Sequence, residues 1–263
     1  DYENGSIKWN IEFDGSTDLI ELDGENRAWI VSSVYDIELN DFMESAISLI
    51  DSGDIVEKYI LDERPWSIHP FEEGKAFFGL GRPKTGVLEL TEKKGKLMHK
   101  HNSIHDSPVL CGSHLPPFYL GHSNGMITKI DEKGNITNLE LNKKHGSAII
   151  DISSNNEQIL ICLENKQIIC LNKDGEEENS LEVLDSEGHP EFLDIIDGST
   201  SDGLVNFWIV TSTNNGSLLI NANRKNESSN IKLKIKANSR IRDIANAKGM
   251  TVVGLDDGRI IAI

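Results

Sequence analysis

The chain has 263 residues, of which 38% are hydrophobic and 26% are charged. This composition is typical of a globular protein and excludes a disordered, collagen-like or coiled-coil chain. Lysine and arginine number 26 against 43 aspartates and glutamates, a formal net charge of −17. The negative charge argues against nucleic-acid binding and against binding to anionic membranes, and no apolar run approaches the length of a membrane span.

Short strand patterns occur along almost the whole chain. Residues 6–12 are predicted to form a strand, the fourth of the last repeat. Residues 40–51 form the one helix-like stretch, but their apolar spacing fits a loop and a strand equally well. Later runs, such as 159–163, 168–171 and 252–255, are apolar and bounded by turn-forming or charged residues, as expected of strands. We therefore predict an all-β chain.

One unit recurs: a short strand centred on a polar residue or a cysteine, followed by three more strands. Asn-Gly or Asp-Gly dipeptides at 124–125, 215–216 and 257–258 mark hairpins, because such turns need positive φ. The central residues of the six first strands are Glu21, His69, Cys111, Asp151, Asp194 and Asp243, spaced by 40 to 49 residues. Four strands in about 40–50 residues are typical of a β-propeller blade.

The two ends of the chain complement each other. The chain ends on a predicted third strand, 258–263, and begins with a turn and a strand within residues 1–13. We predict a single domain over residues 1–263, a six-bladed β-propeller of four-stranded antiparallel blades. The N-terminal strand is expected to complete the last blade and close the ring, which would leave no open edge.

The joined ends also carry a family resemblance. The segment DGRIIAI at 257–263, followed by DYENGSIKWNIEF at 1–13, resembles the repeat of quinoprotein-like (PQQ-type) propellers: a strand, an Asp, a Gly-containing turn and a strand bearing a Trp, here Trp9. The blades as a whole are more loosely similar to WD40-type repeats. The resemblance implies a propeller architecture. It transfers no functional residues, because the other blades lack the Trp motif.

The six central residues occupy the strands expected to line the channel of the propeller. If they point inward, their carboxylates, imidazole and thiol form a ring that suits a divalent cation. The candidate cation ligands are Glu21, His69, Asp151, Asp194 and Asp243. Alternatively, these side chains hydrogen-bond backbone amides or the neighbouring blade, because buried polar groups are paired. We favour the structural alternative, and we predict no other cofactor.

Two surface features are candidates for binding a partner. Segment 34–51 is longer than its counterparts, so Phe42 and Met43 could form an apolar hook on a binding loop; an irregular first blade explains the length equally well. The second feature alternates lysines with apolar residues. It fits a docking strip for an acidic partner or an edge strand protected by lysines, which we favour. Its lysines are Lys232, Lys234 and Lys236.

These features together favour a non-catalytic scaffold for protein–protein interactions, a monomeric domain that is a subunit or adaptor of a larger complex. We identify neither an HExxH motif nor a Gly-rich phosphate loop. The alternative is a cation- or ligand-binding protein, or an enzyme, that uses the acidic ring. Three cysteines are too few for a disulfide framework, which favours a reducing, cytoplasmic compartment, although the sequence is also compatible with a signal peptide that has been removed.

Overall fold

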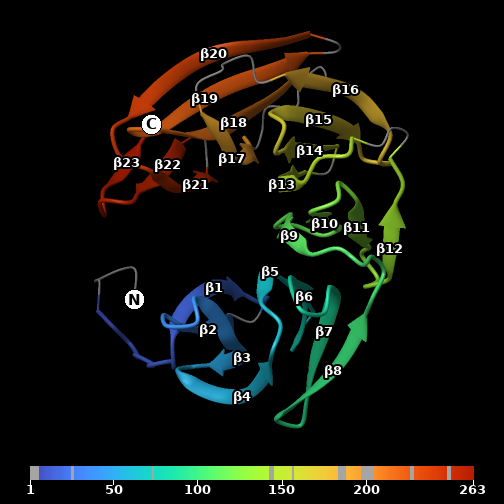
Figure 1. Cartoon of the computed structure of the whole chain (residues 1–263), viewed down its shortest axis with the longest axis vertical. Coiled ribbons are helices and arrows are strands. Elements are labelled where there is room, and N and C mark those ends of the chain that lie inside the picture. The colour runs from blue at the N-terminus through green and yellow to red at the C-terminus, as the bar shows by residue number, and fades with distance from the viewer. Residues whose placement is uncertain are drawn as a thin grey trace. The chain divides into compact units, whose positions relative to one another are not determined.

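The computed structural model describes residues 6–24, 27–72, 74–141, 145–155, 157–182, 188–196, 204–225, 228–247 and 250–263. The chain divides into two compact units, residues 1–112 with 130–137 and residues 113–129 with 138–263. The described secondary structure consists of antiparallel strands (Figure 1). None of the described residues forms a helix long and apolar enough to cross a membrane.

Two four-stranded sheets lie in the first unit, and in both the spatial order of the strands follows the chain order. The first sheet comprises β1 (Ser16–Leu22), β2 (Ala28–Asp36), β3 (Asp41–Asp51) and β4 (Asp54–Leu61). The second comprises β5 (Pro65–Glu72), β6 (Lys75–Leu80), β7 (Gly86–Lys93) and β8 (Lys96–Asn102). The third sheet contributes strands to both units: β9 (Val109–Gly112), β10 (Phe118–His122), β11 (Ile127–Ile130) and β12 (Ile136–Leu139).

The remaining three sheets lie in the second unit. They are β13 (Ile149–Ser154), β14 (Gln158–Leu163), β15 (Gln167–Asn172) and β16 (Glu177–Glu182); then β17 (His189–Ile195), β18 (Leu204–Thr213), β19 (Gly216–Lys225) and β20 (Ser228–Ala237); and finally β21 (Ile241–Ala247), β22 (Met250–Leu255) and β23 (Ile260–Ala262). Each of the six predicted first strands is the first strand of a sheet. The all-β prediction of six successive antiparallel sheets is therefore confirmed.

Neighbouring sheets in each unit pack face to face through apolar side chains. In the first unit, Trp29 of β2 meets Phe78 of β6 edge-on, with ring centroids 5.7 Å apart, inside a buried cluster that joins the first two sheets. In the second unit, a cluster around Phe207 joins the fourth and fifth sheets, and one around Trp208 joins the fifth and sixth. Alternating side chains of one strand thus serve two cores, because successive residues point to opposite faces. The three cysteines are free thiols and buried.

The helix-like stretch at 40–51 is a strand. It forms β3, which pairs with β2 from Ala28 to Asp36 through a turn at 37–40. The expectation that segment 34–51 is a long loop is therefore wrong, because its extra length extends the β2–β3 hairpin, whose pairing continues to Asp36 and Asp41. The alternative, an irregular first blade, agrees with the register shift between Val34 and Tyr35.

The predicted closure of the ring is not seen in the described residues. The sixth sheet has three strands, and residues 6–13 belong to no strand; residues 1–5 of the predicted turn lie outside the described part of the chain. Ile11 and Phe13 pack against Ala28, Ile30 and Ile50 of the first sheet.

Candidate functional site

The first unit carries a pocket of about 1000 Å³. It lies where the β2–β3 hairpin, the β4–β5 link, the β6–β7 turn and the β8–β9 link come together, since these connections share one end of consecutive antiparallel sheets. The apolar lining residues are Phe42, Met43, Trp66, Pro83, Pro108 and Leu110; the charged ones are Asp62, Arg64, Arg82 and Asp106. We call this the Arg64 pocket.

Arg64 holds a central position in this pocket. Its guanidinium carbon lies 3.9 Å from the ring centroid of Phe42 and 4.2 Å from that of Trp66. The aromatic contacts fix the plane of the cation, as cation–π contacts at these distances do. The backbone of Arg64 is also held, because its carbonyl accepts the Gly81 amide (2.8 Å) and its amide donates to the Arg82 carbonyl (3.3 Å).

Gly81 is required by this packing. A Cβ at position 81 would lie 2.3 Å from Nε1 of Trp66, far inside van der Waals contact. The missing side chain lets the indole lie against the β6–β7 turn, while 41% of Trp66 stays exposed. The pocket therefore presents a large aromatic surface on a rigid support.

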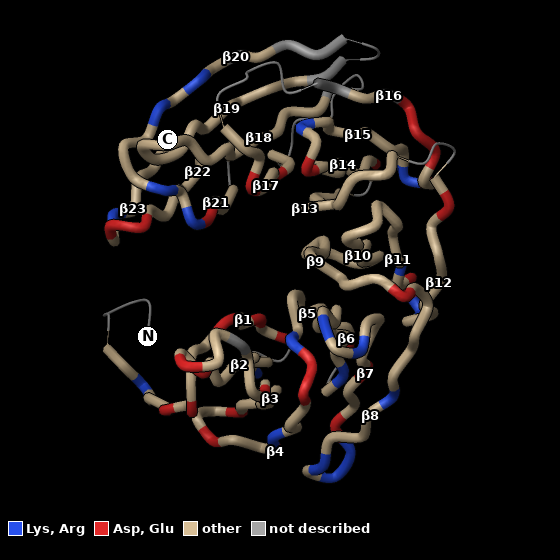
Figure 2. The backbone as a smooth tube through the Cα atoms, viewed as in Figure 1, with Lys and Arg blue, Asp and Glu red and all other residues tan. Residues whose placement is uncertain are grey.

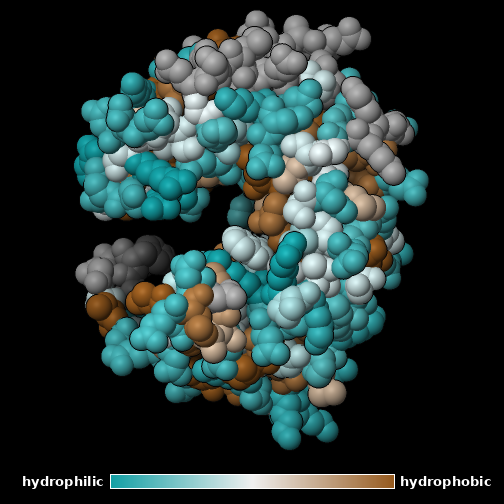
Figure 3. All heavy atoms as spheres, viewed as in Figure 1, coloured by the Kyte–Doolittle hydropathy of each residue, from teal (hydrophilic) through white to brown (hydrophobic). Residues whose placement is uncertain are grey.

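The β2–β3 hairpin extends the pocket into an apolar tip, which we define as residues 35–43. Ile37 and Leu39 are 85% and 65% exposed, and Met43 is 50% exposed. The turn is ordered, because the Asp36 carboxylate accepts the amides of Glu38 (2.8 Å) and Leu39 (3.0 Å). The face of the molecule drawn in Figure 3 mixes hydrophilic and hydrophobic residues.

Phe42 and Met43, which the sequence predicted as a partner-binding hook, thus both line the Arg64 pocket. Sequence reasoning did not find Arg64 or Trp66. They lie 22 or more residues further along the chain, and no local motif connects them with Phe42. Only the packing of β3 against the β4–β5 link brings the three side chains together.

The candidate cation ligands lie on the first strands as predicted, but at two different positions. The register skips one residue in β1, β13, β17 and β21, and it skips two residues, Trp66 and Phe71, in β5. Asp151 and Asp243 directly follow a skipped residue. Glu21, His69 and Asp194 lie three residues after one, which for His69 is Trp66. The assumption that they are equivalent is therefore wrong. A bulge adds a residue that the sequence pattern does not reveal.

Several of these side chains join neighbouring strands and sheets. The two oxygens of Asp151 accept the amides of Ile152 (2.9 Å) and of Leu193 in the next sheet (2.7 Å). One residue pair further along, the Ser153 hydroxyl accepts the Ile195 amide (3.1 Å) and donates to Asp194 (3.2 Å). In the first unit, the buried His69 ring bonds the hydroxyl of Ser67 on its own strand (2.8 Å). The bonds of Asp151 and Asp194 thus have a structural role between sheets, whereas that of His69 is local.

Burial makes Asp151 unusual. Desolvation raises its pKa to about 6, although the two amide hydrogen bonds and the charge of His114 act in the opposite direction. Cys111, the sixth member of the predicted ring, is buried. Among the described residues, no group of three or more His, Cys, Asp or Glu side chains is arranged to hold a metal ion. A cation bound by the acidic ring stays a prediction.

The lysine-rich segment forms β20, the outermost strand of the fifth sheet. Lys234 and Lys236 are exposed on it, and the side chain of Lys232 lies outside the described part; Figure 2 marks basic positions along β20 in blue. Ile231 and Leu233 on the same strand are 42% and 46% exposed. The edge position predicted for these lysines is confirmed, and their role in docking stays a prediction.

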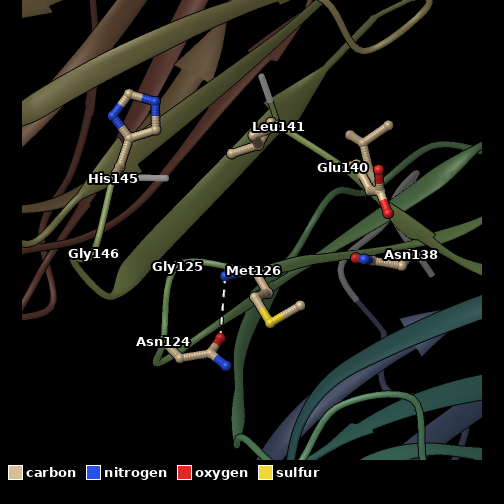
Figure 4. Close-up of a pocket in the computed structure, with 9 residues that line it drawn as sticks. Asn124, Gly125, Met126, Asn138, Glu140, Leu141, His145 and Gly146 are labelled. Carbon is tan, nitrogen blue, oxygen red and sulfur yellow. Dashed lines mark hydrogen bonds between the residues drawn. The ribbon is translucent and has the colours of Figure 1, made fainter. Parts of the chain in front are cut away.

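A second pocket, of about 570 Å³, lies in the second unit (Figure 4). Asn124 and Gly125 on its wall end the sequence Gly-His-Ser-Asn-Gly at 121–125, a Gly-x-Ser-x-Gly spacing that sequence reasoning missed. The structure places this spacing on a β10–β11 hairpin turn, whereas a nucleophile elbow joins a strand to a helix. The imidazole of His145 points away from this turn and bonds Glu177 (3.2 Å). The arrangement does not assemble a serine nucleophile.

Comparisons with known proteins establish the fold. No protein-family model and no curated protein matches the chain. Among solved structures, it is similar to BamB from Moraxella catarrhalis (TM-score 0.64, 12% identity, covering 100% of this chain and 76% of that one). It is also similar to YCF48 bound to D1 peptide (TM-score 0.63, 12% identity, 95% and 79% covered).

The fold is a β-propeller. A catalytically inactive virginiamycin B lyase from Staphylococcus aureus, solved with quinupristin, also matches (TM-score 0.60, 14% identity, 92% of each chain covered). A WD40 propeller domain, that of Doa1, matches with a TM-score of 0.56 at 13% identity over 77% of this chain and 65% of that domain. The expected propeller resemblance is thereby confirmed. At these identities the likeness concerns the fold alone.

Proposed function

We propose that this propeller is a non-catalytic interaction module that binds a segment of a protein partner at the Arg64 pocket and the adjoining apolar tip. The observation that carries the proposal is the gathering of exposed large side chains on ordered elements around one pocket. Trp, Arg, Tyr and Met are enriched in protein interfaces. Here Trp66, Arg64 and Met43 line the pocket, and Tyr35 contacts Phe42 of its lining.

The tip is organised before any partner arrives. Tyr35 and Phe42 meet edge-on across the hairpin at 5.1 Å, and the Tyr35 hydroxyl donates to Asn40. A preordered surface loses little conformational entropy on binding, which leaves more of the contact energy for affinity. This supports a binding role for Ile37 and Leu39, because their exposed side chains do not contribute to the core.

The charge of the hairpin favours a protein over a nucleic acid or an anionic membrane. No lysine or arginine occurs between residues 28 and 57, while Glu38 and Glu44 are exposed. Phosphate-rich surfaces would be repelled from this end of the sheet. The similar solved structures include a peptide complex and a lyase, so the fold by itself favours neither binding nor catalysis; the surface supports binding.

We also propose that residues 6–12 complete the sixth sheet and close a six-bladed ring. The support comes from the properties of the two segments that would pair, β23 and residues 6–12, each considered separately. In the part of the chain that the structure describes, β23 pairs with a strand on one side only, and Ile260 is 77% exposed. Residues 6–12 alternate apolar with polar side chains, as an added strand requires. An unpaired edge invites association with other chains, so completing the sheet protects the protein.

The binding proposal is tested by selecting ligands from a displayed library of random 12-residue peptides and measuring their affinity by fluorescence anisotropy. Trp66→Ala and Leu39→Ser should each weaken the selected peptides at least tenfold, because both remove exposed contact area. Met98→Ala is the matched control, since Met98 is 58% exposed on β8. Ligands whose affinity changes in neither variant would refute this site.

A further inference from the structure

The side chain of Arg64 is fixed in place but makes no hydrogen bond with any other described residue. Its nearest anionic group is Oδ2 of Asp18, 3.8 Å away, beyond hydrogen-bond distance. A guanidinium is a planar fork of N–H donors that matches the two oxygens of a carboxylate. The rings of Phe42 and Trp66 thus hold this fork at the pocket while leaving its donors available.

Asp18 forms a long ion pair with Arg64 but makes no hydrogen bond to it. Its Oδ1 accepts the Ser16 hydroxyl (2.7 Å), and its Oδ2 is buried without a hydrogen-bond partner. A charge-assisted hydrogen bond would be shorter than this pair. The N–H donors of Arg64 are therefore available to a ligand, although Asp18 partly compensates its charge.

A second arginine lines the same pocket. Arg82 is exposed on the β6–β7 turn and forms no ion pair with the described residues. Asp62 and Asp106 are also part of the lining, and Asp18 pairs with Arg64, so the two arginines face three carboxylates. These carboxylates repel a ligand with one negative charge less than they repel a phosphate dianion.

Apart from Gly81 and Thr85, the remaining lining is apolar: Phe42, Met43, Trp66, Pro83, Pro108 and Leu110. We propose that the Arg64 pocket recognises a carboxylate of the partner, presented beside an apolar side chain, and that Arg64 is the residue that binds it. The inference rests on the proposed function and specifies its chemistry. The carboxylate belongs to a glutamate or aspartate side chain or to a chain terminus.

The test titrates ¹⁵N-labelled protein and follows the indole N–H of Trp66, assigned with Trp66→Phe. The probes are acetyl-Pro-Leu with a free C-terminus, acetyl-Pro-Glu-Leu-amide, and the neutral acetyl-Pro-Gln-Leu-amide. At least one carboxylate peptide should bind ten or more times tighter than the neutral one, since charge-assisted bonds are worth about 1.5–3 kcal/mol. The carboxylate peptide that binds identifies the source of the group.

Variants assign the effect to Arg64. Arg64→Gln should abolish the preference for the carboxylate, and Arg64→Lys should lose most of it because an ammonium lacks the fork. Arg82→Gln should reduce the preference for the carboxylate by a smaller factor. Because Arg82 is exposed, this variant should fold normally and tests the charge of the pocket even if the Arg64 variants misfold. Arg242→Gln is the matched control, since Arg242 is exposed and already paired with Asp256 (2.8 Å).

Three outcomes would overturn the inference: equal binding of the neutral peptide, no binding of either carboxylate peptide, or displacement of the bound peptide by inorganic phosphate at an equal concentration. The first leaves the interaction module standing, because the indole signal of Trp66 then still reports binding at this pocket. The second leaves it standing if library peptides still lose affinity in Leu39→Ser. Failure of the inference and failure of the proposed function are therefore distinguishable.

Discussion

The position of a carboxyl group relative to a bulge and a neighbouring sheet decides its chemistry here. Asp151 and Asp243 both follow a skipped residue in their strands, and both accept the amide of the next residue, at 2.9 and 2.8 Å. Asp151 also bonds Leu193 of the next sheet and is desolvated, whereas Asp243 is exposed. The same residue type in the same register position is thus a sheet-to-sheet link in one case and a surface group in the other.

Asp151 should leave a signature in the pH dependence of stability. Its folded pKa of about 6 lies above the unfolded value of about 3.9, so between these values the folded state binds more protons. The contribution of Asp151 to the free energy of unfolding therefore falls as the pH rises from about 4 to about 6 and is constant above. Asp151→Asn removes this titration, so its melting temperature relative to wild type should rise from pH 4 to pH 7.

Asp243→Asn is the matched control for this measurement, because it removes an exposed carboxylate at the same register position. Calorimetry of the three proteins at pH 4, 5, 6 and 7 gives the comparison. A difference between Asp151→Asn and wild type that is independent of pH would contradict the prediction.

At the scale of strands, close approach between sheets depends on a missing side chain. A Cβ on Gly79 of β6 would lie 2.4 Å from Cγ1 of Val109 on β9 and 2.6 Å from the Ser67 hydroxyl of β5. These three strands meet within the first unit, so no room exists for a larger residue. Such a glycine determines spacing between sheets and is not needed for a turn.

Gly79→Ala should therefore destabilise the protein by about 1–3 kcal/mol, the usual cost of overpacking. Gly254→Ala on β22 is the control, because the nearest atom to its added Cβ is 3.9 Å away; it should change stability by less than about 0.5 kcal/mol. Urea unfolding of both variants measures the difference. Equal stability of the two would show that β6 and β9 adjust freely.

At the scale of the whole molecule, the outer edge of β23 is where closure of the propeller would occur. Thr251 and Ile263 exchange both backbone hydrogen bonds, so the alternation of an antiparallel pair directs the amides of Ile260 and Ala262 away from β22. These two amides would be bonded if residues 6–12 complete the sheet. Their protection therefore reports on closure directly.

Hydrogen exchange followed by NMR should show slow exchange at Ile260 and Ala262 in the wild-type chain. Successive amides of a strand point in opposite directions, so only one of residues 7 and 8 would direct its amide toward β23. Proline at that position removes the amide that pairs with β23. One of the two variants, Ile7→Pro or Lys8→Pro, should therefore make the amides of Ile260 and Ala262 exchange fast. Lys8→Ala should keep the protection. Fast exchange of both amides in the wild-type protein would count against closure by this segment.

Much of the fold followed from local patterns. Period-2 alternation and Asn-Gly or Asp-Gly turns located the six first strands, because strand faces and hairpin turns are read from neighbouring residues. The sequence pattern did not reveal the bulges, because an extra residue changes the register of a strand without changing its composition. As a result, the polar residues assumed to be equivalent differ by two positions relative to the bulge. At the candidate site, Phe42 and Met43 were found as apolar residues in a long segment, but Arg64 and Trp66 carried no local signal.

The sequence by itself determined that this chain builds successive small antiparallel sheets, because alternation and turn chemistry act over a few residues. Only the tertiary structure decided which side chains work together. The contact of Arg64 with Phe42 and Trp66, and the bond from Asp151 to Leu193, join residues that are far apart in the chain. Such contacts depend on how whole sheets pack. The sheets are held together by the burial of the apolar core between them, and the residues that meet at the edge of this core contribute little to that packing.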